Sequence, residues 1–157
     1  MSANGFRPVW RDKDVEQVFE RLGDRADNAA QKLLQRAGEE FVKYARLKGN
    51  YQDHTGNLRS SIGYAVIKDG KPMVSNVQKS GKGTDRSTGM EEATRLIQDL
   101  AAVYTNGYVL VGFAGMRYAL YVEGHKNLDV ISGASLRAED FIRTTSRILF
   151  EKLSKQQ

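Results

Sequence analysis

The longest hydrophobic pattern in the chain runs from residue 15 to residue 47, where apolar side chains recur every three or four positions. This spacing predicts one long amphipathic helix with a single buried face. Asp14 is placed to cap the helix or to interact with its positive end, and Gly49 marks the natural stop. Gly23 and Gly38 interrupt the pattern at about 1 kcal/mol each relative to Ala, which predicts a kink or a close approach by another segment at either glycine.

The next pattern has a period of two and predicts a β-hairpin. Residues 62–68 alternate between two sets of apolar side chains, as in a strand that is covered on both faces. Asp69-Gly70 then supplies a two-residue turn, because both positions tolerate positive φ. A return strand follows and includes Met73 and Val77.

The register and the position of this hairpin can also be read from single residues. The tightest register would pair Lys68 with Lys71, and this like-charge pair argues against it. Pro72 cannot donate to a ladder, so the return strand is predicted at an edge of the sheet. The stretch that follows, residues 79–89, is rich in Gly, Ser and Lys and predicts a mobile, exposed basic loop.

The remaining elements follow in the last third of the chain. Apolar spacing predicts a second helix over residues 90–104, with Thr88 as a cap. Residues 108–113 predict a strand central to the sheet, whereas the apolar run 118–123 is too short for its periodicity to be classified. A C-terminal helix is predicted to begin near Ser135.

This order of elements indicates an α+β fold, with a small, mostly antiparallel sheet packed against a long N-terminal helix and a C-terminal helix. A chain of 157 residues is expected to have one core. We expect an N-terminal arm over residues 1–13 and a single domain over residues 14–157, with the mobile basic loop at 79–89.

Composition narrows the classes of protein that remain. The chain has no cysteine, no apolar leader at its start and no run of about 18 apolar residues, which favours a soluble, intracellular protein. A net charge of +5 suits contact with an anionic partner, so a small basic nucleic-acid-binding protein is the alternative function. The bases are interspersed with acids, which favours loose attraction over a dedicated binding site.

The sequence contains none of the catalytic or metal-binding motifs that we considered. The glycines around Lys82 lack the Walker spacing, since Asn76 stands at the first glycine position and Gly83 where Ser or Thr must follow. His54 and His125 are the only histidines and do not have metal-site spacing. There is no G-x-S-x-G elbow and no cysteine nucleophile, so we expect no enzyme activity, no cofactor and no metal.

A polar segment with the sequence H-T-G-N-L-R-S-S-I occupies residues 54–62. Asn57 is a good cap for a single helical turn, which would place Leu58 and Ile62 together in the core and leave Arg59 outward. The segment is either a connector from loop to strand or a site where Arg59 contacts a partner.

A second segment, Y-A-L-Y-V-E, ends at Glu123. Its two tyrosines suit either a core or an interface. An acid at the end of an apolar run needs a donor when it is buried, and Arg59 or the amides of the Gly124 turn are the candidates.

Taken in order, T-G-N-L-R-S-S-I, the V-x-V-G-F strand at 109–113, Y-A-L-Y-V-E and the C-terminal helix resemble the head-tail joining family of long-tailed, lambda-like bacteriophages. These are neck or tail-completion proteins, also called minor tail components. The resemblance covers roughly residues 15–149. The positions that carry the family motif are Thr55, Gly56, Asn57, Leu58, Arg59, Tyr118, Ala119, Tyr121, Val122 and Glu123.

The resemblance implies a structural protein of a phage or prophage, without enzyme activity or cofactor. It implies a ring of copies at the head-tail interface of the virion, formed in the host cytoplasm and in contact with connector, adaptor and tail proteins but with no membrane. Nonspecific contact with DNA in the lumen would suit the positive charge. We expect the edge strand and the basic loop to order on docking, with contacts at Met73, Val77, Lys79, Lys82 and Arg86.

Overall fold

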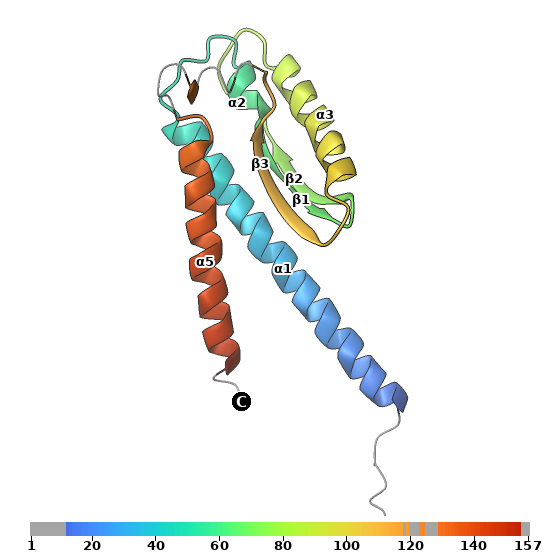
Figure 1. The fold of residues 1–157 in the computed structure, drawn as a ribbon. Helices are drawn as coiled ribbons and strands as arrows, with labels where there is room; N and C mark the ends of the chain where they lie inside the picture. Colours follow the sequence, from blue (N-terminus) through green and yellow to red (C-terminus); the bar gives the residue numbers. More distant parts are fainter. Residues whose placement is uncertain (1–11, 118, 120–122, 125–128, 155–157) are drawn as a thin grey trace, which may run out of the picture. The chain divides into compact units, whose positions relative to one another are not determined.

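The structure is a computed structural model that describes residues 12–117, 119, 123–124 and 129–154 (Figure 1). The chain divides into two compact units, residues 1–30 and 31–157. Helix α1 (Asp12–Lys48) contributes its N-terminal part to the first unit and its C-terminal part to the second.

The second unit combines helices with an antiparallel sheet, so the predicted α+β fold is confirmed. Both long helices of the prediction are present, one at each end of the described chain. The elements after α1 are α2 (Asn57–Ser61), β1 (Ile62–Lys68), β2 (Lys71–Val77), α3 (Ser87–Val103), β3 (Tyr108–Ala114) and α5 (Ser132–Ser154).

The strand order is β2-β1-β3, with both pairings antiparallel. The edge position predicted for the return strand β2 is therefore confirmed. The central position predicted for residues 108–113 is wrong, because among the described strands β3 pairs only with β1. β1 is the central strand, and its first six residues are all buried.

The tight hairpin register that Lys68 and Lys71 argued against does form. The Lys68 ammonium lies 5.0 Å from the ring centroid of Tyr108 on β3, so a cation–π contact offsets the like-charge pairing. Asp69 and Gly70 take φ values of 49° and 77°, as a tight hairpin turn requires. The register shifts between Val66 and Ile67, which accommodates the proline on the edge strand.

The alternation of β1 places one set of its side chains on each face of the sheet, as the sequence predicted. On one face, its side chains share a core cluster with residues of α1 and α5; on the other, they share a cluster with α3 (Figure 1). The first cluster includes Phe41, Val42, Ala45, Ile62, Tyr64, Val66, Ala134 and Ala138. The second consists of Ala65, Ile67, Ala93, Ile97, Ala101 and Phe113.

Two glycines allow α1 and the sheet to interlock. The ring of Tyr64 occupies the space that a Cβ on Gly38 would need, and the ring of Phe41 lies 2.7 Å from the Cβ position of Gly112 on β3. Around Gly23, by contrast, no atom lies within 4 Å of its Cβ position. The close approach predicted for α1 is therefore confirmed at Gly38, and α1 runs through both glycines as one helix.

Helix α5 begins at Ser132, three residues before the predicted start. Its first turn is stabilised by Asp129, whose Oδ1 accepts a hydrogen bond from the Gly133 amide at 2.9 Å. The predicted apolar face is buried at Ala138 but exposed at Ile148 and Leu149. The apolar face of α5 is thus only partly covered within its unit.

Candidate interaction surfaces

The segment at residues 54–62 folds as the predicted single turn, α2, but Asn57 does not cap it. The carboxylate of Asp53 does so, by accepting hydrogen bonds from the amides of Gly56 at 2.9 Å and Arg59 at 2.7 Å. Gly56 adopts a φ of 79°, which explains why the turn uses glycine there. Leu58 is buried in the core beside Ile62, as predicted.

Asn57 instead joins α2 to the start of α3. Its Oδ1 accepts from the Gly89 amide at 2.9 Å, and its Nδ2 donates to Oδ2 of Asp85 at 3.1 Å. Asp85 also accepts from the Ser87 amide and the Thr88 hydroxyl, so it caps α3 in the place predicted for Thr88. The hydrogen bond from Asn57 is the main cause that lowers the pKa of Asp85.

Arg59 does not point outward, so this prediction is wrong. Its Nη2 donates to the carbonyls of Gly49 at 3.3 Å and Tyr51 at 3.4 Å, and its guanidinium lies 4.7 Å from the Tyr51 ring centroid. Tyr51 is buried, which raises the pKa of its hydroxyl to about 12. Arg59 therefore connects α2 to the segment that follows α1.

Hydrogen bonds also tie the basic loop to α2. The Ser60 hydroxyl accepts from the Ser80 amide at 2.9 Å, and the Asp85 amide donates to the Thr55 carbonyl at 3.0 Å. Arg86 donates to the Ser80 carbonyl at 3.1 Å. The loop is shorter than the predicted 79–89, because residues 87–89 belong to α3. Ser80 and Asp85 fix it to the motif segment, and its mobility elsewhere stays a prediction.

The second motif segment is described only in part. Tyr118, Tyr121 and Val122 lie outside the described residues, while Ala119 is buried in the first core cluster. Glu123 accepts from the amide of Ser132 at 2.9 Å and from its hydroxyl. Arg59, one of the predicted donors, is engaged elsewhere, and Glu123 stabilises the N-terminus of α5. The other candidate, the turn at Gly124, continues into residues 125–128, which lie outside the described residues.

Two side chains of α1 that the sequence did not single out hold the hairpin in place. Arg46 donates to the carbonyls of Ile62 and Gln78, each at 2.8 Å, and burial lowers its pKa. Glu39 accepts from the Tyr64 hydroxyl at 2.8 Å and from Nδ2 of Asn76 at 2.9 Å. Both residues lie where α1 packs against the ends of strands. The periodicity of a local sequence segment does not predict such contacts, because the partners are distant in sequence.

The five residues predicted to contact a partner protein lie in two parts of the second unit. Met73, 46% exposed, lies near the hairpin turn, whereas Val77 ends β2 and leads into the loop with Lys79, Lys82 and Arg86. Both lysines are exposed, and Arg86 is partly buried. A hollow of about 320 Å³ lies between β2 and α3, lined by Pro72, Ser75, Val77, Met90, Thr94, Ile97 and Gln98.

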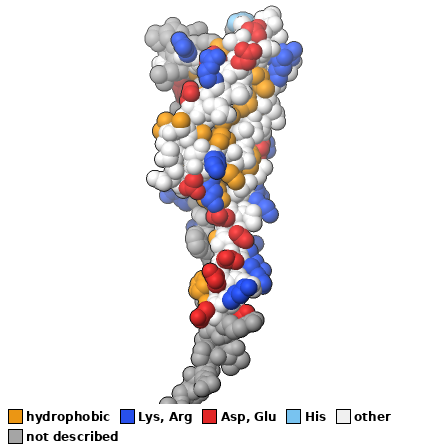
Figure 2. Space-filling model, turned by 90° about the vertical axis from the view of Figure 1, so that its right-hand side faces the viewer, with side chains coloured by type: hydrophobic (Ala, Val, Ile, Leu, Met, Phe, Trp, Pro, Cys, Tyr) orange, Lys and Arg blue, Asp and Glu red, His pale blue; other side chains and the backbone are white. Residues whose placement is uncertain are grey.

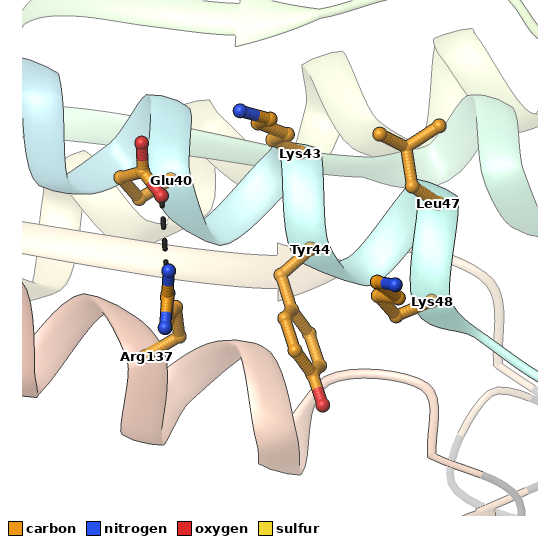
Figure 3. A pocket seen from close by; sticks show the side chains of 6 residues that line it. All are labelled: Glu40, Lys43, Tyr44, Leu47, Lys48 and Arg137. Carbon is orange, nitrogen blue, oxygen red and sulfur yellow. Dashed lines mark ion pairs between the residues drawn. The ribbon is translucent and has the colours of Figure 1, made fainter.

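A second hollow, of about 230 Å³, lies between the C-terminal part of α1 and the start of α5 (Figure 3). We call it the basic groove, because three cationic side chains and one carboxylate line it. Its residues are Glu40, Lys43, Tyr44, Leu47, Lys48 and Arg137. Arg137 Nε lies 4.0 Å from Oε2 of Glu40.

Within the described parts of the chain, no group of three or more His, Asp or Glu side chains is placed to hold a metal ion. His54 is exposed and His125 lies outside these parts. None of the described helices is long and apolar enough to cross a membrane.

The fold and these surfaces define a small α+β protein whose polar motif residues hold its own elements together. Residues 13–124 match a protein-family model, HK97-gp10-like, described as "Bacteriophage HK97-gp10, putative tail-component". The match covers most of the chain and includes both motif segments, so the chain belongs to this family and is a bacteriophage structural protein. The resemblance to minor tail components is thereby confirmed, while no curated protein and no solved structure matches the chain.

Proposed function

We propose that the chain joins the DNA-filled head to the tail, as a ring of copies in the neck of a phage or prophage particle. The observation that carries the proposal is the family match over residues 13–124, which contains both motif segments. The side chains of Asn57, Arg59 and Glu123 support a structural role without enzyme activity, because each is used to join elements of the fold.

The contact with the adjoining ring is assigned to β2 and the basic loop. In the described sheet, β2 pairs only with β1, so the outer edge of β2 can accept an extended segment of another protein. The sequence suggested that this edge strand orders on docking, but β2 is already paired with β1, and Arg46 and Glu39 fix the hairpin against α1. An edge that is fixed before docking loses less entropy when a partner binds. The hollow beside Val77 would receive apolar side chains of the partner.

Lys79 and Lys82 supply exposed positive charge beside this edge. In a ring around the DNA channel, such charges attract phosphates without reading the sequence, and salt weakens the attraction. Sequence-selective duplex binding that survives physiological salt would instead favour a nucleic-acid-binding protein. The protein is synthesised in the host cytoplasm and becomes part of the virion at the head-tail interface.

Deletion of the gene from a phage that carries it tests the proposal. We expect filled heads and separate tails in electron micrographs, and joined virions in the deletion strain would overturn the assignment. Complementation with Met73→Asp or with Lys79→Glu/Lys82→Glu should fail although both proteins fold. Lys71→Glu, an exposed change at the turn end of β2, is the matched control and should restore joined virions.

A further inference from the structure

The N-terminal part of α1, in the first unit, carries an apolar stripe that is open to solvent. Val18, Phe19 and Leu22 are 53%, 68% and 53% exposed and lie on one helical face together with Val15. Large apolar side chains gathered on one face of a helix mark a site of contact with another protein. We call this face the α1 stripe.

The same part of α1 is acidic, although the chain as a whole is basic. Residues 12–30 contain six acids and three bases, a net charge of −3, against +5 for the whole chain. The rest of the chain therefore carries +8. Asp12, Glu16, Glu20 and Asp24 follow one another at four-residue spacing and form an acidic ridge. The ridge begins beside the α1 stripe at Asp12 and Glu16 and then turns away from it, because each four-residue step advances about 40° around the helix. Figure 2 shows acidic side chains on this part of α1, with basic side chains beside them.

The basic groove has the complementary character. Tyr44 and Leu47 offer apolar surface, and Leu47 is 72% exposed. Lys43, Lys48 and Arg137 line the same hollow, with Glu40 as its single acid (Figure 3). An amphipathic helix with acids beside its apolar face fits a hollow of this kind, with its apolar face as the anchor.

We propose that the α1 stripe of one copy docks in the basic groove of a second copy. Because the two surfaces differ and each copy offers both, the contact is head-to-tail and repeats from copy to copy; it closes into a ring where the rotation allows. Antiparallel pairing of one stripe with another would bring two acidic ridges together, which disfavours it. The inference deepens the ring assembly of the proposed function and rests on it.

Cross-linking of the purified full-length chain tests the contact directly. A photoreactive residue replaces Phe19, and a mixture with isotope-labelled chain identifies links between copies. We expect links to peptides that contain residues 43–48 or 137. Links between two copies of the α1 stripe would overturn the proposal, and so would a chain that is monomeric by sedimentation at about 1 mM.

Charge reversal gives a second and independent test. Lys43→Glu/Lys48→Glu should weaken self-association at least tenfold, and so should Phe19→Ser. Glu16→Lys/Glu20→Lys, mixed with the groove variant, should restore association. Val103→Ser, at 70% exposure, is the matched control and should leave association unchanged. If Lys43→Glu/Lys48→Glu associated as strongly as the wild type, the proposal would be overturned.

These solution measurements are separate from the deletion phenotype. If the deletion strain gives separate heads and tails while groove and stripe variants associate normally, only this contact is refuted. If the deletion strain gives joined virions, the neck assignment fails whatever the chain does in solution.

Discussion

Replacement of Gly38 by alanine tests whether the contact between α1 and the sheet limits the stability of the second unit. The new Cβ would overlap the ring of Tyr64, which is 0% exposed and whose hydroxyl donates to Glu39 at 2.8 Å. Movement of the ring would strain the core and lose this hydrogen bond. Overpacking costs about 1–3 kcal/mol and the lost bond about 1 kcal/mol, against a gain of about 1 kcal/mol in helix propensity.

We therefore expect Gly38→Ala to lower the free energy of unfolding by about 1–3 kcal/mol. Urea unfolding followed by circular dichroism measures the change. Gly23→Ala is the matched control in the same helix, because its Cβ would meet no atom within 4 Å. It should leave stability unchanged or raise it by up to about 1 kcal/mol.

A double-mutant cycle isolates the ring contact. In a Tyr64→Val background the ring is gone, so Gly38→Ala should cost little or become stabilising. If Gly38→Ala were as stable as the wild type, or equally costly with and without the Tyr64 ring, the reasoning would be refuted.

Three further predictions concern the polar contacts of α2 and α3. Asn57→Ala leaves the buried Gly89 amide without its acceptor and should lower the unfolding free energy by about 1–3 kcal/mol in urea titrations, whereas Gln52→Ala, an exposed change, should not. The folded pKa of Asp85 is lowered, so its contribution to stability is complete above its ordinary value of 3.8 and is lost as pH falls below it; Asp85→Asn should flatten this acid limb of the stability curve. Burial raises the pKa of Tyr51, so stability should fall as pH rises from 10.0 to about 12, and Tyr51→Phe should reduce this fall in the same titrations.

The helices and strands could be predicted because burial in this fold follows local periodicity. Residues 62–68 alternate in sequence, and the structure uses both sets of side chains, one for each core cluster. The order of the strands could not be read in this way. β3 is as apolar as a central strand, but its partner and its edge position depend on segments distant in sequence.

The capping residues also show that local sequence does not predict contacts between distant segments. The sequence identified Asn57 as a cap, and it does bind a helix N-terminus, but that helix starts 30 residues later. Asp53 caps α2 in place of Asn57, because its carboxylate accepts a hydrogen bond from the amide of Gly56, three residues later. The type of side chain predicts that a cap exists, whereas the helix that it serves depends on tertiary packing.

Polar side chains of the motif at residues 54–62 form hydrogen bonds within the fold, so binding specificity must lie elsewhere on the protein. Ser60 and Ser61 are fully buried, and the first donates its hydroxyl to the Gly56 carbonyl while the second donates to the Leu58 carbonyl. With Asn57 and Arg59 also engaged, the segment has little hydrogen-bonding capacity left for a partner. The motif therefore identifies the fold, and we propose that neighbouring proteins are recognised by surfaces with exposed side chains: the edge of β2, the basic loop, the α1 stripe and the basic groove. Substitutions in the motif should consequently act through stability, and substitutions on those surfaces through assembly.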